Sequence, residues 1–257
     1  MSKRKPYARI AITLPPEDLA AADRLAKAQD RSRSWIIAEA IRKYASAPET
    51  AAARPKGLGP FRLDQLRSDL ALSPEQRIRS AERTRRLDRY VGRVAEPHTE
   101  PEGEFDTAVA QVCSRLNREN ARYLVVGATA MQLWGTTRAT KDIDILIEPT
   151  AENAARVLHA LGTIGFGFAT EFLPEEIAAQ TVTIIGDSPR VDVLTRAWNL
   201  RWSEAAPRAT TFEIEGVPIP TASIEDLIAS KRTDRLQDAA DIEVLEEIRR
   251  LRKGEAR

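Results

Sequence analysis

A six-residue segment near the amino terminus constrains the fold of this chain more than any other feature. Residues 9–14 alternate between two faces, as a half-buried β-strand requires: apolar Ile10, Ile12 and Leu14 on one, and Arg9, Ala11 and Thr13 on the other. Pro15 and Pro16 end the strand. Residues 1–46 hold no second strand pattern, so the backbone of this one needs a partner from another copy of the chain. We therefore expect a homodimer formed through the amino-terminal strands.

Two amphipathic helices are predicted after the strand. The first starts with Glu17 and Asp18, whose carboxylates suit the positive end of a helix dipole, and stops near Asp30. The second has Ser32 as its N-cap and runs to about Ala45. Residues 1–46 contain ten Lys and Arg against five Asp and Glu, a net charge of +5 in a chain whose total is +1. A basic head on a mildly acidic body indicates that the head binds a polyanion.

Residues 8–46 resemble the MetJ/Arc/CopG ribbon-helix-helix family in the alternating strand, the proline-acid helix start and the Arg31–Ser34 helix opening. The resemblance implies that two strands pair into a ribbon that enters the major groove of double-stranded operator DNA. The DNA-binding residues it implies are Arg9, Ala11 and Thr13 on the ribbon, and Ser32, Arg33 and Ser34 at a helix start suited to phosphate. Use of the module for dimerisation alone is the alternative, and the positive charge argues against it.

The rest of the chain is predicted to consist of a linker and a body. Residues 47–104 begin with a stretch rich in Ala, Pro and Gly, typical of a linker, and contain a basic helix at about 74–94. Its arginines form either a second nucleic-acid surface or a solvated helix face balanced by acids. Residues 105–257 alternate helix and strand patterns and predict an α/β domain with a mixed sheet and carboxyl-terminal helices. The fold class of the whole chain is therefore α+β.

Two aspartates define the candidate site of the body. Asp142 and Asp144 are two residues apart on a predicted strand, so their carboxylates share one face while Ile143 and Ile145 face the core. With the glycine turn of Val125–Met131, this segment resembles the DNA polymerase β-like nucleotidyltransferase superfamily over residues 105–250. The resemblance implies that Asp142, Asp144 and a third carboxylate, Asp192, hold Mg²⁺ and act in catalysis.

The same resemblance implies a nucleoside triphosphate as the substrate. The residues it assigns to nucleotide binding are Gly127, Ala128, Thr129, Arg138, Lys141 and Lys231. Ala128 departs from the superfamily, which usually has glycine or serine at that position. The segment 231–241 is similar to a charged helix of the toxin-antitoxin and abortive-infection nucleotidyltransferases, although an ordinary exposed charged helix is the alternative.

Two functions fit these patterns. In the first, the body transfers a nucleotidyl group from an NTP to an RNA or protein acceptor with Mg²⁺, and the head binds operator DNA for autoregulation. In the second, the chain is a transcriptional regulator or antitoxin with a catalytically silent nucleotidyltransferase fold. The family setting implies a cognate toxin or antitoxin as a partner in either case. The sequence has no apolar run near the length of a membrane span and no secretory h-region, so we expect a cytoplasmic protein without a membrane partner.

Overall fold

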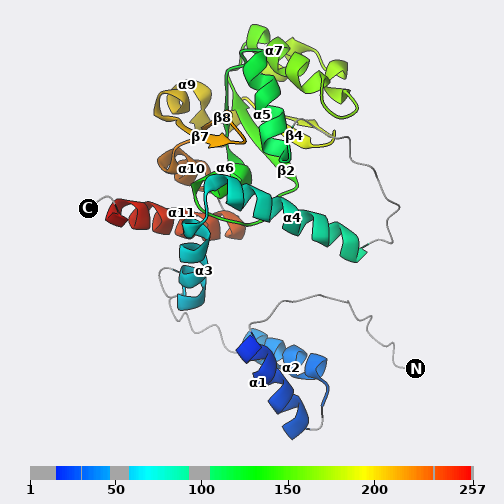
Figure 1. The fold of residues 1–257 in the computed structure, drawn as a ribbon, viewed down its shortest axis with the longest axis vertical. Helices are drawn as coiled ribbons and strands as arrows, with labels where there is room; N and C mark the ends of the chain where they lie inside the picture. The colour runs from blue at the N-terminus through cyan, green and yellow to red at the C-terminus, as the bar shows by residue number, and fades with distance from the viewer. Residues whose placement is uncertain (1–15, 30, 47–57, 93–104, 234, 256–257) are drawn as a thin grey trace. The chain divides into compact units, whose positions relative to one another are not determined.

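The computed structural model describes residues 16–29, 31–46, 58–92, 105–233 and 235–255, and the chain divides into two compact units, residues 1–56 and 57–257 (Figure 1). The first unit, called the head below, contains helices α1 (Pro16–Ala28) and α2 (Arg33–Ser46). Ser32 caps α2 as predicted, because its Oγ accepts a hydrogen bond from the Trp35 amide at 3.2 Å. The predicted strand at residues 9–14 lies outside the described residues.

The described helices of the head leave large apolar side chains uncovered within one protomer. Ala22 and Ile36 are buried, whereas Leu19, Leu25 and Trp35 are exposed. Several exposed large apolar side chains on so small a unit are typical of a surface that another chain covers. This pattern agrees with a head that needs a second copy to complete its core.

The second unit, called the body below, is built on a mixed six-stranded sheet with strand order β3-β4-β2-β1-β8-β7. Its strands are β1 (Tyr123–Val125), β2 (Asp142–Ile147), β3 (Val182–Ile185), β4 (Arg190–Leu194), β7 (Thr210–Ile214) and β8 (Val217–Thr221). A short hairpin, β5 (Arg196–Ala197) with β6 (Leu200–Arg201), forms a separate sheet. Strand β2 is antiparallel to β1 and parallel to β4, so the polar ends of β2 and β4 lie side by side.

Helices surround the sheet. They are α3 (Pro60–Ala71), α4 (Pro74–Gly92), α5 (Ala108–Arg118), α6 (Gly127–Trp134), α7 (Ala151–Gly162), α8 (Pro174–Ala179), α9 (Trp202–Ala205), α10 (Ile224–Ser230) and α11 (Leu236–Glu255), with 3₁₀ turns at Phe168–Glu171 and Ala206–Arg208. Helix α5 packs on β8 and α7, whereas α6 packs on β2, α4 and α10 (Figure 1). In the described part of the chain, no helix is both long and apolar enough to cross a membrane.

Helix α4 is part of the body and is not an isolated basic helix. The Arg77 side chain is only 1% exposed and donates from Nε to the Gln132 carbonyl at 2.8 Å and from Nη2 to the Leu133 carbonyl at 2.7 Å. Ile78 beside it is also buried. Neither role predicted for the arginines of this helix, nucleic-acid contact or a solvated face, describes Arg77. Its guanidinium instead joins α4 to the end of α6.

The hairpin of β7 and β8 was not predicted from the sequence. Its two-residue turn is Glu215-Gly216, with φ of 53° and 75°, the left-handed values that a two-residue type I′ turn requires. Pro218 and Pro220 obscured β8, because proline is rare inside a sheet. Strand β1 pairs with β8 only at Thr221. On the side that faces β1, the two prolines therefore do not need to donate a backbone hydrogen bond.

Candidate functional site

Three aspartates lie on one face of the paired strands β2 and β4. Asp144 pairs in register with Asp192, and Asp142 pairs with Arg190. The residues between them face the core, since Ile143, Ile145, Val191 and Val193 are all buried. The predicted alternation of both strands is therefore confirmed, and the parallel register brings the carboxylates of Asp144 and Asp192 next to each other. We call Asp142, Asp144 and Asp192 the carboxylate cluster.

Arg190 neutralises part of this cluster. Its Nε and Nη2 each donate to an oxygen of Asp192 at 2.9 Å, and Nη2 lies 3.7 Å from Oδ2 of Asp142. The hydrogen bonds with Asp192, followed by its charge, raise the pKa of Arg190 above its ordinary value. No role of Arg190 was predicted from the sequence. A two-residue spacing on a strand, Arg-x-Asp, was the available pattern, because it places both side chains on the same face.

Asp144 is the most perturbed member of the cluster. Burial raises its pKa, and the charges of Asp142 and Asp192 raise it further, to about 6. The charge of Lys231 and a hydrogen bond from the Ala128 amide oppose this shift. A carboxylate whose neighbours carry the same charge is held at an energetic cost that a bound cation would reduce.

The turn before α6 packs directly on Asp144. Gly127 has a φ of +61°, and a Cβ at that position would collide with Oδ2 of Asp144. Glycine is needed here both for the backbone conformation and for the close approach. The Ala128 amide, which the sequence analysis assigned to a triphosphate, donates to Asp144 in this structure.

The other predicted nucleotide-binding residues are distributed over two places. Thr129 is buried with its Oγ1 3.5 Å from the Asp142 carbonyl, so its hydroxyl faces β2. Lys141 is exposed and lines a cavity beside the cluster. Arg138 and Lys231 instead pair with Asp241, at 3.0 and 2.6 Å. Lys231 still acts on the cluster, because its charge lowers the pKa of Asp144.

The donor chemistry of the cluster fits Mg²⁺, which prefers carboxylate oxygens. Thr140 Oγ1 donates to Oδ1 of Asp142 at 2.9 Å, whereas the other carboxylate oxygen of Asp142, Oδ2, lies nearest to Arg190. Among the described residues, no group of three His, Cys, Asp or Glu side chains is arranged to hold a metal ion. Both oxygens of Asp192 are engaged by Arg190. Asp142 and Asp144 would be the first ligands, and Asp192 would join them once Arg190 moves away.

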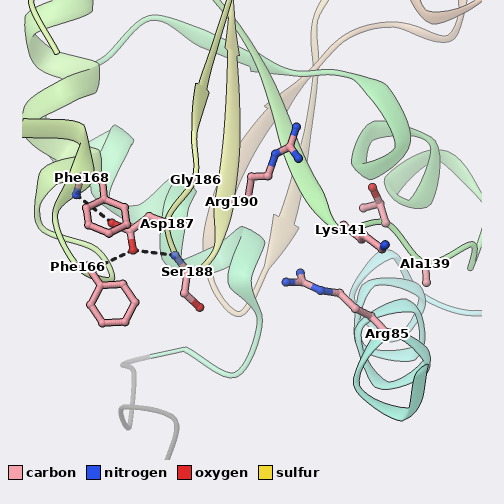
Figure 2. Close-up of a pocket in the computed structure, with 10 residues that line it drawn as sticks. Arg85, Ala139, Lys141, Phe166, Phe168, Gly186, Asp187, Ser188 and Arg190 are labelled. Atoms are coloured by element: carbon pink, nitrogen blue, oxygen red, sulfur yellow. Dashed lines mark hydrogen bonds between the residues drawn. The ribbon is translucent and has the colours of Figure 1, made fainter. Parts of the chain in front are cut away.

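A cavity of about 780 Å³ opens beside the cluster. Its lining residues are Arg85, Ala139, Thr140, Lys141, Phe166, Phe168, Gly186, Asp187, Ser188 and Arg190 (Figure 2). Of these residues, only Lys141 was predicted from the sequence as a site residue. The repeat Gly165-Phe166-Gly167-Phe168 was the pattern that could have indicated the aromatic part, because two phenylalanines flanked by glycines rarely belong to a packed core.

Comparison with known families assigns the head. Residues 8–46 match the model for ribbon-helix-helix proteins of the CopG family. These residues are therefore a ribbon-helix-helix module, a kind of domain that binds DNA as a dimer. A search of curated proteins returns no match to the chain.

Proposed function

We propose that this chain is a DNA-binding regulator whose body is a Mg²⁺-dependent nucleotidyltransferase, in a toxin-antitoxin-like setting. The regulator part rests on the ribbon-helix-helix module at residues 8–46. The transferase part rests on one observation, the convergence of Asp142, Asp144 and Asp192 on one face of two parallel strands beside the Gly127 turn. Two or more carboxylates in such a position are the arrangement that phosphoryl-transfer sites use to hold divalent cations.

In the proposed reaction, an acceptor hydroxyl attacks the α-phosphorus of an NTP. A bond forms between that oxygen and phosphorus, the α–β phosphoanhydride breaks and pyrophosphate leaves. Asp142 and Asp144 would hold Mg²⁺, which would offset the charge of the triphosphate. Asp192 would accept the proton of the attacking hydroxyl or add a third ligand after Arg190 releases it. Lys141, one residue before Asp142, would contact a phosphate. The acceptor is an RNA or a protein.

A second candidate is a regulator or antitoxin with a silent nucleotidyltransferase-like body. Arg190 favours it, because its guanidinium already supplies a positive charge to Asp192 and Asp142. The Ala128 amide also favours it, since it is used by Asp144. In this case the three aspartates and Arg190 form a structural ion-pair network.

Thermal melts with and without Mg²⁺ and ATP separate the two candidates. For a transferase, ligands raise the Tm of the wild type, while Asp142→Asn and Asp144→Asn lose this response and are no less stable than the wild type without ligand. Transfer of label from an NTP is also lost in both variants. Asp64→Asn, an exposed carboxylate on α3, is the matched control. A wild type that does not respond to ligand, together with destabilised variants, would establish the silent body.

A further inference from the structure

The cavity beside the carboxylate cluster has two walls of different chemistry. Figure 2 shows the rings of Phe166 and Phe168 on one side of the opening, and Lys141 and Arg85 on the other. Arg190 lies between the two walls and also pairs with Asp192 of the carboxylate cluster. A ligand in this cavity would therefore meet flat apolar surface, positive charge and the proposed reaction centre in one continuous space.

The aromatic wall is held in place although it is open to solvent. Phe166 and Phe168 are 79% and 42% exposed, and their rings stack with centroids 5.7 Å apart at an angle of 28°. Oδ1 of Asp187 accepts the Phe166 amide at 2.7 Å, and Oδ2 accepts the Phe168 amide at 3.1 Å. Burial alone would raise the pKa of Asp187, but these backbone hydrogen bonds outweigh it and lower the pKa. Asp187 therefore stays ionised and fixes the loop.

The glycines of this loop serve the same arrangement. Gly165 has a φ of +60°, and a Cβ there would collide with the Asp187 carboxylate and the Ser188 carbonyl. Hydrogen bonds to the Asp187 carboxylate thus hold two aromatic rings in positions where they face solvent. Folding alone gains little from exposed rings, so this arrangement indicates a ligand that covers them.

We propose that this cavity binds the end of a single-stranded nucleic acid, with bases stacked on Phe166 and Phe168 and phosphates held by Lys141, Arg85 and Arg190. Aromatic stacking combined with positive side chains along one groove is the usual way in which proteins bind single strands. The inference deepens the proposed function, because it names the class of the acceptor. It rests on the proposed transferase activity only in taking the bound strand as the acceptor of the reaction. Binding itself requires neither NTP nor Mg²⁺.

Fluorescence anisotropy with labelled five-nucleotide RNA and DNA tests the proposal on the full chain, without NTP or Mg²⁺. Such pentamers are single-stranded, so they avoid the duplex groove that the head reads. The double variant Phe166→Ala/Phe168→Ala should lose about tenfold to hundredfold in affinity. Lys141→Ala should weaken binding and reduce the salt dependence by about one phosphate contact. Binding of either pentamer with these losses supports the proposal, and the ratio of the two affinities identifies the sugar.

Two variants make the test specific. Phe61→Ala removes another exposed phenylalanine, on α3, and should leave pentamer affinity unchanged. Asp187→Ala removes a negative charge from the cavity, which on charge alone would strengthen binding of an anion. If Asp187 positions the rings, this variant weakens binding instead.

Three results would overturn the proposal. The first is equal pentamer affinity of the Phe166→Ala/Phe168→Ala variant and the wild type, and the second is stronger binding by Asp187→Ala. The third is displacement of the labelled pentamer by hexaglutamate at the same concentration as by unlabelled pentamer. The last result would indicate an acidic protein segment as the ligand. If the protein binds the pentamer but transfers no label, the binding site is supported and the proposed transferase activity is wrong. If the protein transfers label to another acceptor but does not bind the pentamer, the transferase is supported and the binding site is wrong.

Discussion

The pKa of Asp144 reflects the burial and the charges that surround this side chain. It lies against Gly127, beside Asp192 and within reach of the charge of Lys231, and its pKa is raised to about 6 by burial and by the other two aspartates. A carboxyl group in an ordinary structural ion pair has a lowered pKa. For Asp144 the shift is upward because burial disfavours the charged form and because the charges of Asp142 and Asp192 add to this effect. A bound cation would reduce the second of these two contributions.

Asp144→Asn should stabilise the protein in a pH-dependent way. The folded-state pKa of about 6 lies above the ordinary value of 3.8, so the folded state binds this proton more tightly than the unfolded state. The resulting stability is complete below about pH 4 and is lost as the pH rises through 6. The variant should match the wild type at pH 4 and exceed it by up to about 3 kcal/mol at pH 8. Chemical denaturation at both pH values measures this, and a less stable variant at pH 8 would contradict it.

Arg190→Ala should make the protein more responsive to Mg²⁺. Its removal leaves Asp192 and Asp142 without their counterion, so the Tm without metal should fall. At the same time both oxygens of Asp192 become available, and Mg²⁺ should raise the Tm more than in the wild type. Arg196→Ala, at an exposed position on β5, is the control. A variant whose lost stability Mg²⁺ does not restore would favour the silent body.

At the scale of elements, α4 is attached to α6 through the hydrogen bonds of a charged side chain as well as through apolar contact. Arg77 reaches the carbonyls at the end of α6 and also those of Asp69 and Leu72 near the end of α3. Burial lowers its pKa, as does the charge of Arg252, to about 10, so it remains protonated at neutral pH. One side chain thus joins α4 to α3, its neighbour in the sequence, and to the more distant α6.

Arg77→Ala should lower the free energy of unfolding by at least about 3 kcal/mol, because buried carbonyls lose their donors and a cavity forms. Urea denaturation followed by circular dichroism measures this loss. Arg67→Ala on α3 removes an exposed arginine that pairs with Asp64, and it should cost less than about 1 kcal/mol. Similar losses in the two variants would show that the hydrogen bonds of Arg77 contribute little.

At the scale of the whole molecule, the chain combines a ribbon-helix-helix head with a body that carries a separate candidate site. We expect a dimer in solution at micromolar concentration, because a lone ribbon strand cannot satisfy its backbone and the described head helices expose Leu25 and Trp35. Sedimentation equilibrium measures this directly. A stable monomer at that concentration would be incompatible with the ribbon.

The head should distinguish base contacts from phosphate contacts. Arg9→Ala and Thr13→Ala should each cost about 1–3 kcal/mol on the operator and relax its specificity, because these side chains face the major groove in the predicted ribbon. Lys3→Ala should weaken binding to all duplexes equally and flatten the salt dependence. Binding titrations on operator and unrelated duplex, at several salt concentrations, measure both effects. Equal losses on every duplex for all three variants would contradict the ribbon readout.

The sequence by itself determined the features that depend on local periodicity. Alternation placed Asp142 and Asp144 on one face of β2, the cap at Ser32 located the start of α2, and residues 8–46 were enough to identify the head. These patterns depend only on residues that are close in the sequence, so they can be recognised without knowledge of the rest of the fold.

Only the tertiary structure decided which distant residues meet. The pairing of β2 with β4 set Asp144 beside Asp192, the packing of α4 on α6 buried Arg77, and the loop tied by Asp187 brought Phe166 to the cavity. None of these contacts follows from local spacing, because each depends on which strands pair and on how far a side chain reaches between elements. The same strand pairing brings Arg190 within 3.7 Å of Asp142, so Arg190 acts on both strands of the carboxylate cluster.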